Sequence, residues 1–350
     1  MRYSILPLLS ATLTISQITA VLAAPRSPAN TKVTHQFSSL TRAENIAARP
    51  NGDLLVMALN APEILLVDPT LPSQPDLPIA RFPDARSTHG IAEIAPDVFA
   101  VGVGDYIVGV GTTFGNYSIW KVDMRPLRLT RDNATGGATI EQAAEISLIA
   151  DVPESKLFNG MTHLGGDSPY VLVADSVLGA VFRVNTQTGD YKIVIQDALL
   201  NPVPGAPVQI GINGIHMRDS DLYFSQMFLD GGFLGKCPVH LSGPDAGSMS
   251  GNFTIIAKNG PNDDFAIRAE TGDIYTTTHF TNEMQRVRLD GSFETIAGSP
   301  DDPLFANNTA AAWGRGETDK DVLYVSTVGG DGVEPSRDGA RVVAVDFRRS

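Results

Sequence analysis

The chain has 350 residues, of which 43% are hydrophobic and 19% are charged, and its net charge is −13. This composition, with 33 glycines and 23 prolines, is typical of a globular, turn-rich protein. The acidic balance argues against a nucleic-acid partner, which requires clustered Lys and Arg. The single cysteine, Cys237, rules out an intramolecular disulfide framework and is best interpreted as a small buried hydrophobe.

The first 24 residues form a separate segment. Arg2 supplies a positive start, Ile5–Leu22 is an apolar stretch interrupted by Ser, Thr and Gln, and small residues lead to Ala24. These features predict a secretory signal peptide and not a membrane span. Four N-glycosylation sequons support the secretory route, and they lie at Asn116, Asn133, Asn252 and Asn307. We expect residues 25–350 to form one domain that is secreted or kept in a secretory compartment.

Two strands near the start of this domain set the pattern. Thr31–Leu40 is predicted to pair with the last apolar strand, Arg341–Phe347, because joining the chain ends in one sheet removes free edges. Glu44–Met57 then contains a polar pair, a short apolar run, a Pro-Asn-Gly turn and a second apolar strand. Asn-Gly between two apolar runs predicts a hairpin in which both turn positions have positive φ.

Similar polar starts recur along the chain, each before an apolar strand. The later starts are His89-Gly90, Asn159-Gly160, Asn213-Gly214, Asp263-Asp264 and Ala312–Gly314, and the strands that follow are Val98–Val103, Tyr170–Ala174, Asp221–Ser225, Asp273–Thr277 and Val322–Thr327. The spacing of roughly 45 to 70 residues is close to that of a propeller blade. Six units predict an all-β, six-bladed β-propeller whose N-terminal strand closes the last blade. The polar starts would then converge on one axial site.

One long segment interrupts the regular spacing after the fourth unit. Leu229–Gly251 is rich in Gly, Ser and Pro. Loops of this length in compact domains are usually functional or disordered. We therefore expect a lid over one mouth of the channel.

Oxygen-bearing side chains occupy the starts of four units, namely Glu44, Asn159, Asn213 and Asp263. Carboxylate and amide oxygens are the ligands of hard cations such as calcium or magnesium. A bound cation would polarise a substrate carbonyl, and Asp263 could orient or deprotonate a water. Asn and Asp beside glycine also cap turns, so a purely structural role stays open for each of them alone. Four matching repeat positions favour the functional interpretation.

Histidine and apolar side chains near these starts have two interpretations each. His89, His163, His216 and His279 could donate to an anionic oxygen or act as general bases, or could make structural hydrogen bonds. Phe114, Met227, Phe228 and Trp313 could form an apolar wall of the pocket or belong to the core. The motifs of zinc hydrolases and of serine nucleophile elbows do not occur in the sequence, which disfavours both chemistries.

With these residues in place, the chain resembles the regucalcin/gluconolactonase-like superfamily of six-bladed propellers over nearly all of the mature sequence. The resemblance implies that one divalent metal, calcium or another cation, is bound by Glu44, Asn213 and Asp263. It also implies that Asn159 contacts the substrate. The family's Arg two residues before that Asn is here Leu157, and its Asp-Gly pair is Asp263-Asp264. Loss of the Arg removes a charged contact for a polar substrate and disfavours sugar-lactone hydrolysis.

The leader, the sequons and the phrases Glu44-Asn-Ile-Ala-Ala-Arg-Pro-Asn-Gly and Leu323-Tyr-Val-Ser-Thr are similar to a secreted fungal branch that includes hetero-Diels–Alderases of tropolone–sesquiterpene (meroterpenoid) biosynthesis. This resemblance implies that an ortho-quinone methide, formed by loss of water from a hydroxymethyl tropolone or phenol, is joined to a humulene-type alkene.

Such a reaction requires no cofactor. It requires a cavity that orients two small apolar partners and a donor to the heterodiene oxygen. Asn159, Asn213 and His89 are the candidate donors. A calcium-dependent lactone hydrolase and a non-catalytic binding propeller remain the alternatives.

Overall fold

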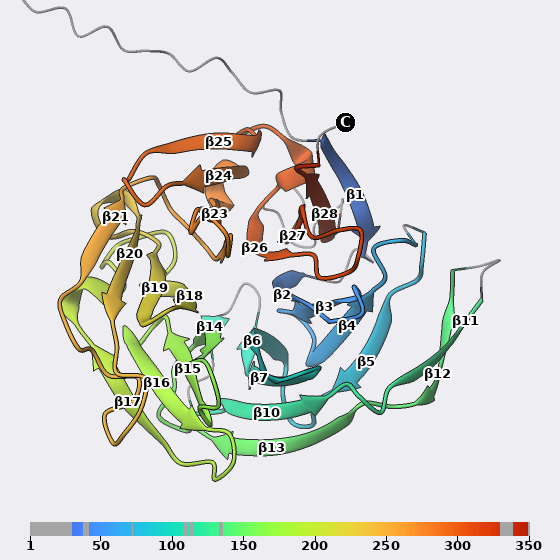
Figure 1. Cartoon of the computed structure of the whole chain (residues 1–350), viewed down its shortest axis with the longest axis horizontal. Coiled ribbons are helices and arrows are strands. Elements are labelled where there is room, and N and C mark those ends of the chain that lie inside the picture. The colour runs from blue at the N-terminus through green and yellow to red at the C-terminus, as the bar shows by residue number, and fades with distance from the viewer. Residues whose placement is uncertain are drawn as a thin grey trace, which may run out of the picture.

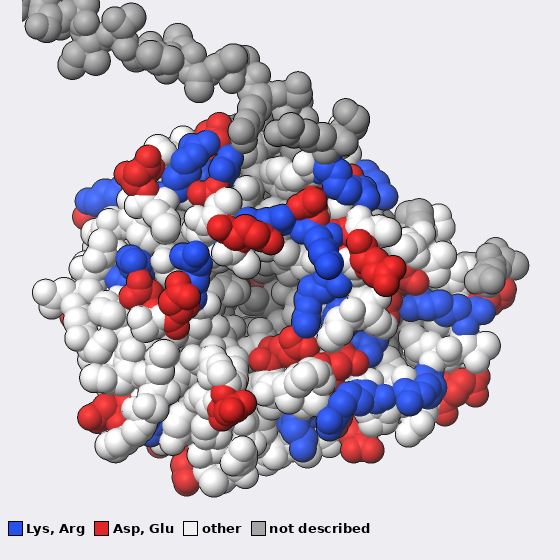
Figure 2. Space-filling view, viewed as in Figure 1, with Lys and Arg blue, Asp and Glu red and all other residues white. Residues whose placement is uncertain are grey.

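The computed structural model describes residues 30–37, 42–71, 73–107, 111–112, 115–132, 136–329 and 339–348. In this part of the chain, six four-stranded antiparallel sheets stand as blades around a common axis (Figure 1). The predicted six-bladed β-propeller is therefore confirmed. The space-filling view shows that one face of the molecule is hollowed at the centre of the ring, with acidic and basic side chains around the hollow (Figure 2).

The first five blades each run in chain order through their four strands. Blade 1 is β2 Ala43–Ala48, β3 Leu54–Ala58, β4 Glu63–Val67 and β5 Leu77–Arg81; blade 2 is β6 Ser87–Ala95, β7 Val98–Gly104, β10 Ser118–Asp123 and β13 Glu145–Asp151. Blade 3 is β14 Phe158–His163, β15 Tyr170–Asp175, β16 Ala180–Asn185 and β17 Tyr191–Gln196; blade 4 is β18 Ile212–Arg218, β19 Asp221–Gln226, β20 Phe233–Pro238 and β21 Thr254–Ala257. Blade 5 is β22 Phe265–Ile267, β23 Ile274–Thr277, β24 Glu283–Val287 and β25 Phe293–Gly298.

Blade 6 joins the two ends of the chain. Its strands are β26 Asn308–Trp313, β27 Val322–Thr327, β28 Arg341–Asp346 and β1 Asn30–Gln36. Blade 2 carries two short hairpins, β8 Tyr106–Ile107 with β9 Gly111–Thr112, and β11 Arg128–Arg131 with β12 Ala138–Gln142. Short 3-10 helices lie in connections, namely η1 Ala198–Leu200, η2 Leu229–Gly231, η3 His279–Thr281 and η4 Pro303–Phe305.

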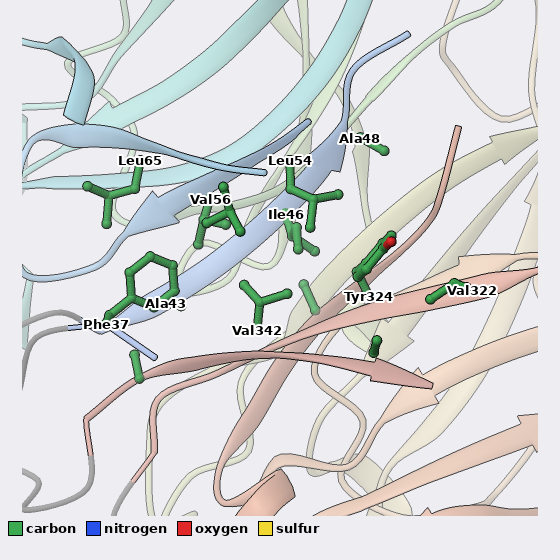
Figure 3. Close-up of a cluster of buried hydrophobic side chains, with 14 residues drawn as sticks. Phe37, Ala43, Ile46, Ala48, Leu54, Val56, Leu65, Val322, Tyr324 and Val342 are labelled. Carbon is green, nitrogen blue, oxygen red and sulfur yellow. The ribbon is translucent and has the colours of Figure 1, made fainter. Parts of the chain in front are cut away.

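The N-terminal strand closes the ring as predicted. β1 pairs antiparallel with β28, from Asn30 opposite Asp346 to Gln36 opposite Arg341. The blade closed in this way packs on blade 1 through a cluster of buried side chains that includes Ile46, Leu54, Val56, Tyr324 and Val342 (Figure 3). Residues far apart in the chain thus share one core, and β28 is paired on both sides, by β27 and by β1.

Both faces of each blade are buried against a neighbour. Among the described residues, six clusters of buried hydrophobic side chains each bridge two adjacent blades. Strands such as β3 are accordingly apolar and buried at every position rather than at alternate positions. Inter-blade packing of this kind fixes the ring, and with it the positions of the inner strands.

Two local predictions are wrong. The turn between β2 and β3 has positive φ at Gly52 alone and not at Asn51, so the hairpin is not the two-residue type. Leu229–Gly251 is not one long lid, because Phe233–Pro238 forms β20 of blade 4. Gly235 in that strand leaves room for the ring of Phe224, so the glycine marks close packing and not a loop.

None of the helices in the described part of the chain is long and apolar enough to span a membrane. The predicted signal peptide, residues 1–24, lies outside the described residues.

Candidate active site at the starts of the inner strands

A β-bulge occupies the polar start of the inner strand in most blades. Two residues of β2, Glu44 and Asn45, lie opposite one residue of β3, and the same two-against-one bulge follows Thr88, Phe158 and Ile212 in three other inner strands. In blade 6, Thr309 alone is left unpaired after Asn308. In blades 1 to 4, the repeated polar pairs of the sequence are these bulged residues. A bulge leaves residues out of the strand pairing and changes the direction of their side chains. The bulges therefore explain why polar residues can occupy this level of the inner strands.

Glycine at the second position of the pair lets neighbouring blades approach at the axis. A Cβ on Gly160 would lie 2.6 Å from Ile215 N and 2.7 Å from Asn213 O in the next blade. A Cβ on Gly90 would overlap Asn159 O, and one on Gly214 would overlap the carboxylate of Asp264. Blades 2 to 5 therefore touch through their backbones at this level, which brings the polar starts together.

The structure brings three predicted site residues together in one cluster. Asn213 Nδ2 donates to Asp263 Oδ1 at 2.6 Å, and His279 Nδ1 lies 3.0 Å from Asp263 Oδ2. Asp263 is only 5% exposed, whereas the His279 side chain is 21% exposed. Burial raises the pKa of the Asp263 carboxyl, and the His279 and Asn213 contacts oppose that rise. Asp263 thus orients an amide from blade 4 and a histidine from its own blade.

Glu44 adds a second buried carboxyl from blade 1. Burial, followed by the nearby charges of Asp263 and Asp264, raises its pKa well above the ordinary value, and Arg42 opposes that rise. The interaction with residues of blade 5 places Glu44 at the same end of the channel. The arrangement concentrates acidic groups in a buried space, which favours a ligand that is cationic or that donates hydrogen bonds.

Among the described residues, three buried amide oxygens at the strand starts lack a hydrogen-bond partner, namely Asn159 Oδ1, Asn213 Oδ1 and, in blade 6, Asn308 Oδ1. The Asn213 amide cannot be turned over without placing its oxygen against the Asp263 carboxylate. Buried polar atoms are normally paired. The orphaned oxygens of Asn159 and Asn213 therefore point to a ligand that donates a hydrogen bond or carries positive charge.

His216 is also tied to this cluster. Its Nε2 lies 2.9 Å from Asp264 Oδ1, its side chain is 33% exposed, and its ring meets Phe265 edge-on at 4.7 Å. His163, by contrast, lies at the far end of β14, where its Nε2 bonds Ser168 O at 2.7 Å. Of the two, only His216 joins the strand-start cluster.

His89 occupies the repeat position in blade 2, but it is packed into the protein. It is 2% exposed, its Nε2 lies 2.8 Å from Ser87 Oγ, and its ring lies 5.7 Å from that of Tyr117. Burial lowers the pKa of His89 to about 3. The imidazole is therefore neutral at physiological pH and is held by its neighbours, so of the three candidate donors it is the one least available to a ligand.

The depressed pKa of His89 predicts a specific pH dependence of stability. Protonation favours the unfolded chain between the ordinary pKa of 6.5 and the folded value of about 3, so stability is lost as pH falls through this window. We expect His89 to account for about 2 kcal/mol of lost unfolding free energy between pH ~7.5 and ~5. Urea unfolding at the two pH values should show a loss smaller by this amount in the His89→Gln variant. Equal losses in both proteins would contradict the assignment.

The predicted apolar wall is only partly assembled. Phe228 is half-buried, while Met227 is 2% exposed and belongs to the interior. Trp313 packs against Tyr275 and Phe347, with ring centroids 5.0 and 5.6 Å away. Phe114 lies outside the described residues.

The predicted start of the sixth unit, which contains Trp313, lies at the wrong end of its strand. The bulged start of blade 6 is Asn308-Thr309, whereas Ala312–Gly314 falls at the other end of β26. Thr309 Oγ1 donates to Glu44 O at 2.7 Å and so links blade 6 to the ring of starts. The prediction of a sixth polar start at Trp313 was wrong, and the structure does not bring that residue to the cluster.

Two residues near the site were not singled out from the sequence. Tyr106 lies in the β8 hairpin, and its pKa is raised by burial and then by the charge of Glu44. Phe280 follows His279 in η3, with ring centroids 4.7 Å apart. Both residues belong to connections between strands, where no periodic signal marks them.

Two cavities that described residues line lie elsewhere. One of about 540 Å³ opens between blades 6 and 1 and includes Asp53, Asp68 and Tyr324, and one of about 690 Å³ lies beside the Leu164–Tyr170 turn. In the first, Arg131 already pairs with both Asp53 and Asp68. Neither cavity is lined by a polar strand start. The cluster around the unpaired amide oxygens therefore remains the candidate active site.

The implied metal ligands can be tested against this geometry. Within the described residues, no group of three or more His, Cys, Asp and Glu side chains is placed to hold a metal ion. The set implied by the resemblance consists of two carboxyls, Glu44 and Asp263, and the amide oxygen of Asn213. Because Asn213 Oδ1 is buried without a donor, these residues fit a hard, oxygen-seeking cation.

The chain is similar to known proteins both in sequence and in fold. No family model matches the chain. A protein from Phoma sp named "Putative hetero-Diels-Alderase" is 26% identical over 318 residues, which cover 85% of this chain and 87% of the relative. Its counterpart asR5 from Sarocladium schorii bears the same description and is 26% identical over 327 residues, covering 85% of this chain and 78% of the relative.

Among solved structures, the calcium-binding protein regucalcin from Agrobacterium tumefaciens superposes with a TM-score of 0.58 at 14% identity. The match covers 92% of this chain and 96% of regucalcin. At this identity the likeness shows a shared fold. The chain is thus similar in sequence to proteins named as hetero-Diels-Alderases and similar in fold to regucalcin.

Proposed function

We propose that this protein catalyses an intermolecular hetero-Diels–Alder cyclisation at the starts of its inner strands. The observation that carries the proposal is the similarity over 85% of the chain to two proteins with that description. As partners we propose a quinone methide derived from a hydroxymethyl tropolone or phenol and a humulene-type sesquiterpene, as in meroterpenoid biosynthesis.

The site geometry is compatible with this reaction. The buried amide oxygens of Asn159 and Asn213 can accept hydrogen bonds from hydroxyl groups of the oxygenated partner. The N–H groups of the Asn159 amide are then available to the heterodiene oxygen, while Asn213 already uses one N–H on Asp263. Holding both partners in register supplies most of the acceleration, and a fixed donor at the developing oxyanion adds to it.

The proposal is tested by incubating the purified protein with a hydroxymethyl tropolone and humulene and measuring the adducts. We expect faster adduct formation and one dominant stereoisomer, compared with a protein-free control and with the heat-denatured protein. Adduct yield and stereoisomer ratios equal to those of the controls would refute the proposal.

A calcium-dependent lactone hydrolase is the second candidate, and the orphaned oxygen of Asn213 beside two buried carboxyls favours it. Glu44, Asn213 and Asp263 would hold the cation, which would supply polarisation of a substrate carbonyl. Leu157 gives the site an apolar side chain, 5% exposed, next to Phe158, where a polar sugar lactone would require a charged contact. The cyclase therefore remains the first candidate.

Removal of divalent metal distinguishes these two functions. After dialysis against a chelator, we expect the cyclisation rate to stay within about twofold of the untreated enzyme, because orientation and hydrogen bonding do not require a cation. A lactonase would lose its activity under the same treatment and regain it with added calcium. Loss of cyclisation that calcium restores would contradict the metal-independent mechanism.

We also propose that the protein enters the secretory pathway and is glycosylated there. Asn252 is exposed, and so is Asn116, although its Nδ2 donates to Asp105 Oδ2 at 3.2 Å. Asn307 is half-buried, has a φ of 50° and donates to Gly329 O. In protein secreted from a fungal host, peptide mass spectrometry should find glycan on Asn252 and little on Asn307. An unmodified Asn252 in secreted protein would contradict this prediction. Asn133 lies outside the described residues.

A further inference from the structure

Two phenylalanines from neighbouring blades stack on each other near the candidate active site. Phe228 lies in the connection from β19 to β20, and Phe280 lies in the connection from β23 to β24. Their ring centroids are 5.7 Å apart and the ring planes are inclined by 40°. Phe280 is 45% exposed. The pair therefore presents aromatic surface to solvent, and we call it the aromatic pair.

The aromatic pair is continuous with the polar cluster. The ring of His279 meets that of Phe280 edge-on at 4.7 Å, and the Nδ1 atom of the same histidine lies 3.0 Å from Asp263 Oδ2. Asp263 in turn accepts a hydrogen bond from Asn213, whose Oδ1 is one of the orphaned amide oxygens. A polar end and an aromatic end thus belong to one connected surface.

The loop that carries Phe280 is fixed in an unusual backbone conformation. His279 and Asn282 have positive φ values of 32° and 53°. Thr278 Oγ1 donates to Glu283 O at 3.0 Å and accepts from Glu283 N at 3.1 Å, while Asn282 Oδ1 accepts from Asn307 N at 2.9 Å. Non-glycine residues keep such conformations only where the surroundings determine them, and they cluster at functional sites.

The partner ring is anchored as well. Gln226, which is fully buried, accepts from Phe228 N at 3.0 Å through its Oε1. Its Nε2 donates to Leu199 O at 3.1 Å and to Asn201 O at 2.9 Å. Both aromatic side chains therefore stand on restrained backbone, and a pre-organised aromatic surface binds an apolar ligand with little loss of loop entropy.

We propose that the aromatic pair is the subsite for the hydrocarbon partner of the cyclisation, an inference that rests on the proposed function. The oxygenated partner occupies the polar end, where its hydroxyl groups donate hydrogen bonds to the unpaired amide oxygens of Asn159 and Asn213. An alkene has no hydrogen bonds to satisfy, and aromatic faces provide contact area without requiring any. Because Phe280 is partly exposed and the amide oxygens are buried, the hydrocarbon lies nearer to solvent and the oxygenated partner lies deeper.

Binding can be measured without the reaction. Titration with the uncharged fluorescent probe phenylnaphthylamine should show a site from which humulene displaces the probe. We expect Phe280→Ala and Phe228→Ala each to weaken probe binding by about tenfold, because each removes much of the apolar contact. Phe280→Tyr should bind normally. The matched control is Phe293→Ala, since Phe293 is 48% exposed on the outer strand β25, and it should have no effect.

Steady-state kinetics separates the two subsites. In Phe280→Ala we expect the KM for the hydrocarbon to rise by about tenfold, while the KM for the hydroxymethyl partner stays unchanged. Probe affinity equal in Phe280→Ala and Phe293→Ala, or equal rises in both KM values, would overturn the inference. Adducts formed by the wild type together with unchanged probe binding in the variants would overturn the subsite alone. Probe binding that depends on the aromatic pair, without any adducts, would leave the subsite standing and overturn the proposed function.

Discussion

Replacement of Gly160 by alanine is expected to destabilise the protein by about 3 kcal/mol or more. A Cβ at this position would lie 2.6 Å from Ile215 N, 2.7 Å from Asn213 O and 2.8 Å from Gly214 Cα. All three atoms are backbone of the next blade, so no side chain can turn aside to make room. Relief would require blades 3 and 4 to separate at the axis. Urea unfolding of the variant gives the free energy directly.

Gly102→Ala is the matched control for this prediction. Gly102 lies in β7 of the neighbouring blade, and a Cβ there would make only ordinary contacts of 3.6 Å with Gly90 O and Met161 Cε. Because alanine also lowers the entropy of the unfolded chain, we expect this variant to unfold within about 1 kcal/mol of the wild type. Similar losses in the two variants would show that the Gly160 contact does not set the spacing of the blades.

The second large effect is expected from Asn159→Leu, and it falls on activity. The two side chains have the same number of heavy atoms, and Asn159 Oδ1 has no partner to lose. Removing a buried, unpaired polar group is neutral or stabilising, so the unfolding free energy should stay equal or rise by about 1 kcal/mol. Loss of the amide at the heterodiene oxygen should lower kcat/KM for cyclisation by about 100-fold.

Thr162→Val provides the opposite pattern on the same strand. Thr162 Oγ1 accepts from Met217 N at 3.0 Å, so valine leaves that N–H without its partner. We expect a loss of about 1–3 kcal/mol in stability and a kcat/KM within about twofold of the wild type. If Asn159→Leu lost stability as Thr162→Val does and kept its activity, the amide would be a structural residue.

Much of the fold could be predicted because its signals are local. The Asn-Gly and His-Gly pairs mark the bulges where inner strands begin, and the apolar strands that follow match the second strands of the blades. Blade 6 broke this rule. Its start, Asn308-Thr309, contains no glycine, like the starts of blades 1 and 5, but unlike them it also contains no acidic residue. A connection of eight residues separates β26 from β27, and the pattern pointed instead to Trp313. In blade 4, β20 was predicted as part of a loop because its segment contains Gly235. That glycine in fact makes room for the ring of Phe224 within the sheet.

The candidate site was predictable in its polar members and not in its apolar ones. Glu44, Asn213 and Asp263 share a repeat position, so ring closure alone brings them together. Phe280 lies in a connection between strands, and its position depends on the positive φ of His279 and on contacts from other blades. The burial of His89 depends likewise on Tyr117 of a later strand connection. Non-periodic tertiary contacts of this kind leave no mark in a single sequence.

The most direct test of the account is a crystal structure of the protein with a hydroxymethyl tropolone bound. The account predicts that an oxygen of the ligand lies within hydrogen-bond distance of the Asn159 and Asn213 amides, and that the ring edge faces Phe280. The account would be contradicted by a ligand seated instead in the cavity of about 540 Å³ between blades 6 and 1, with both amide oxygens still lacking a partner.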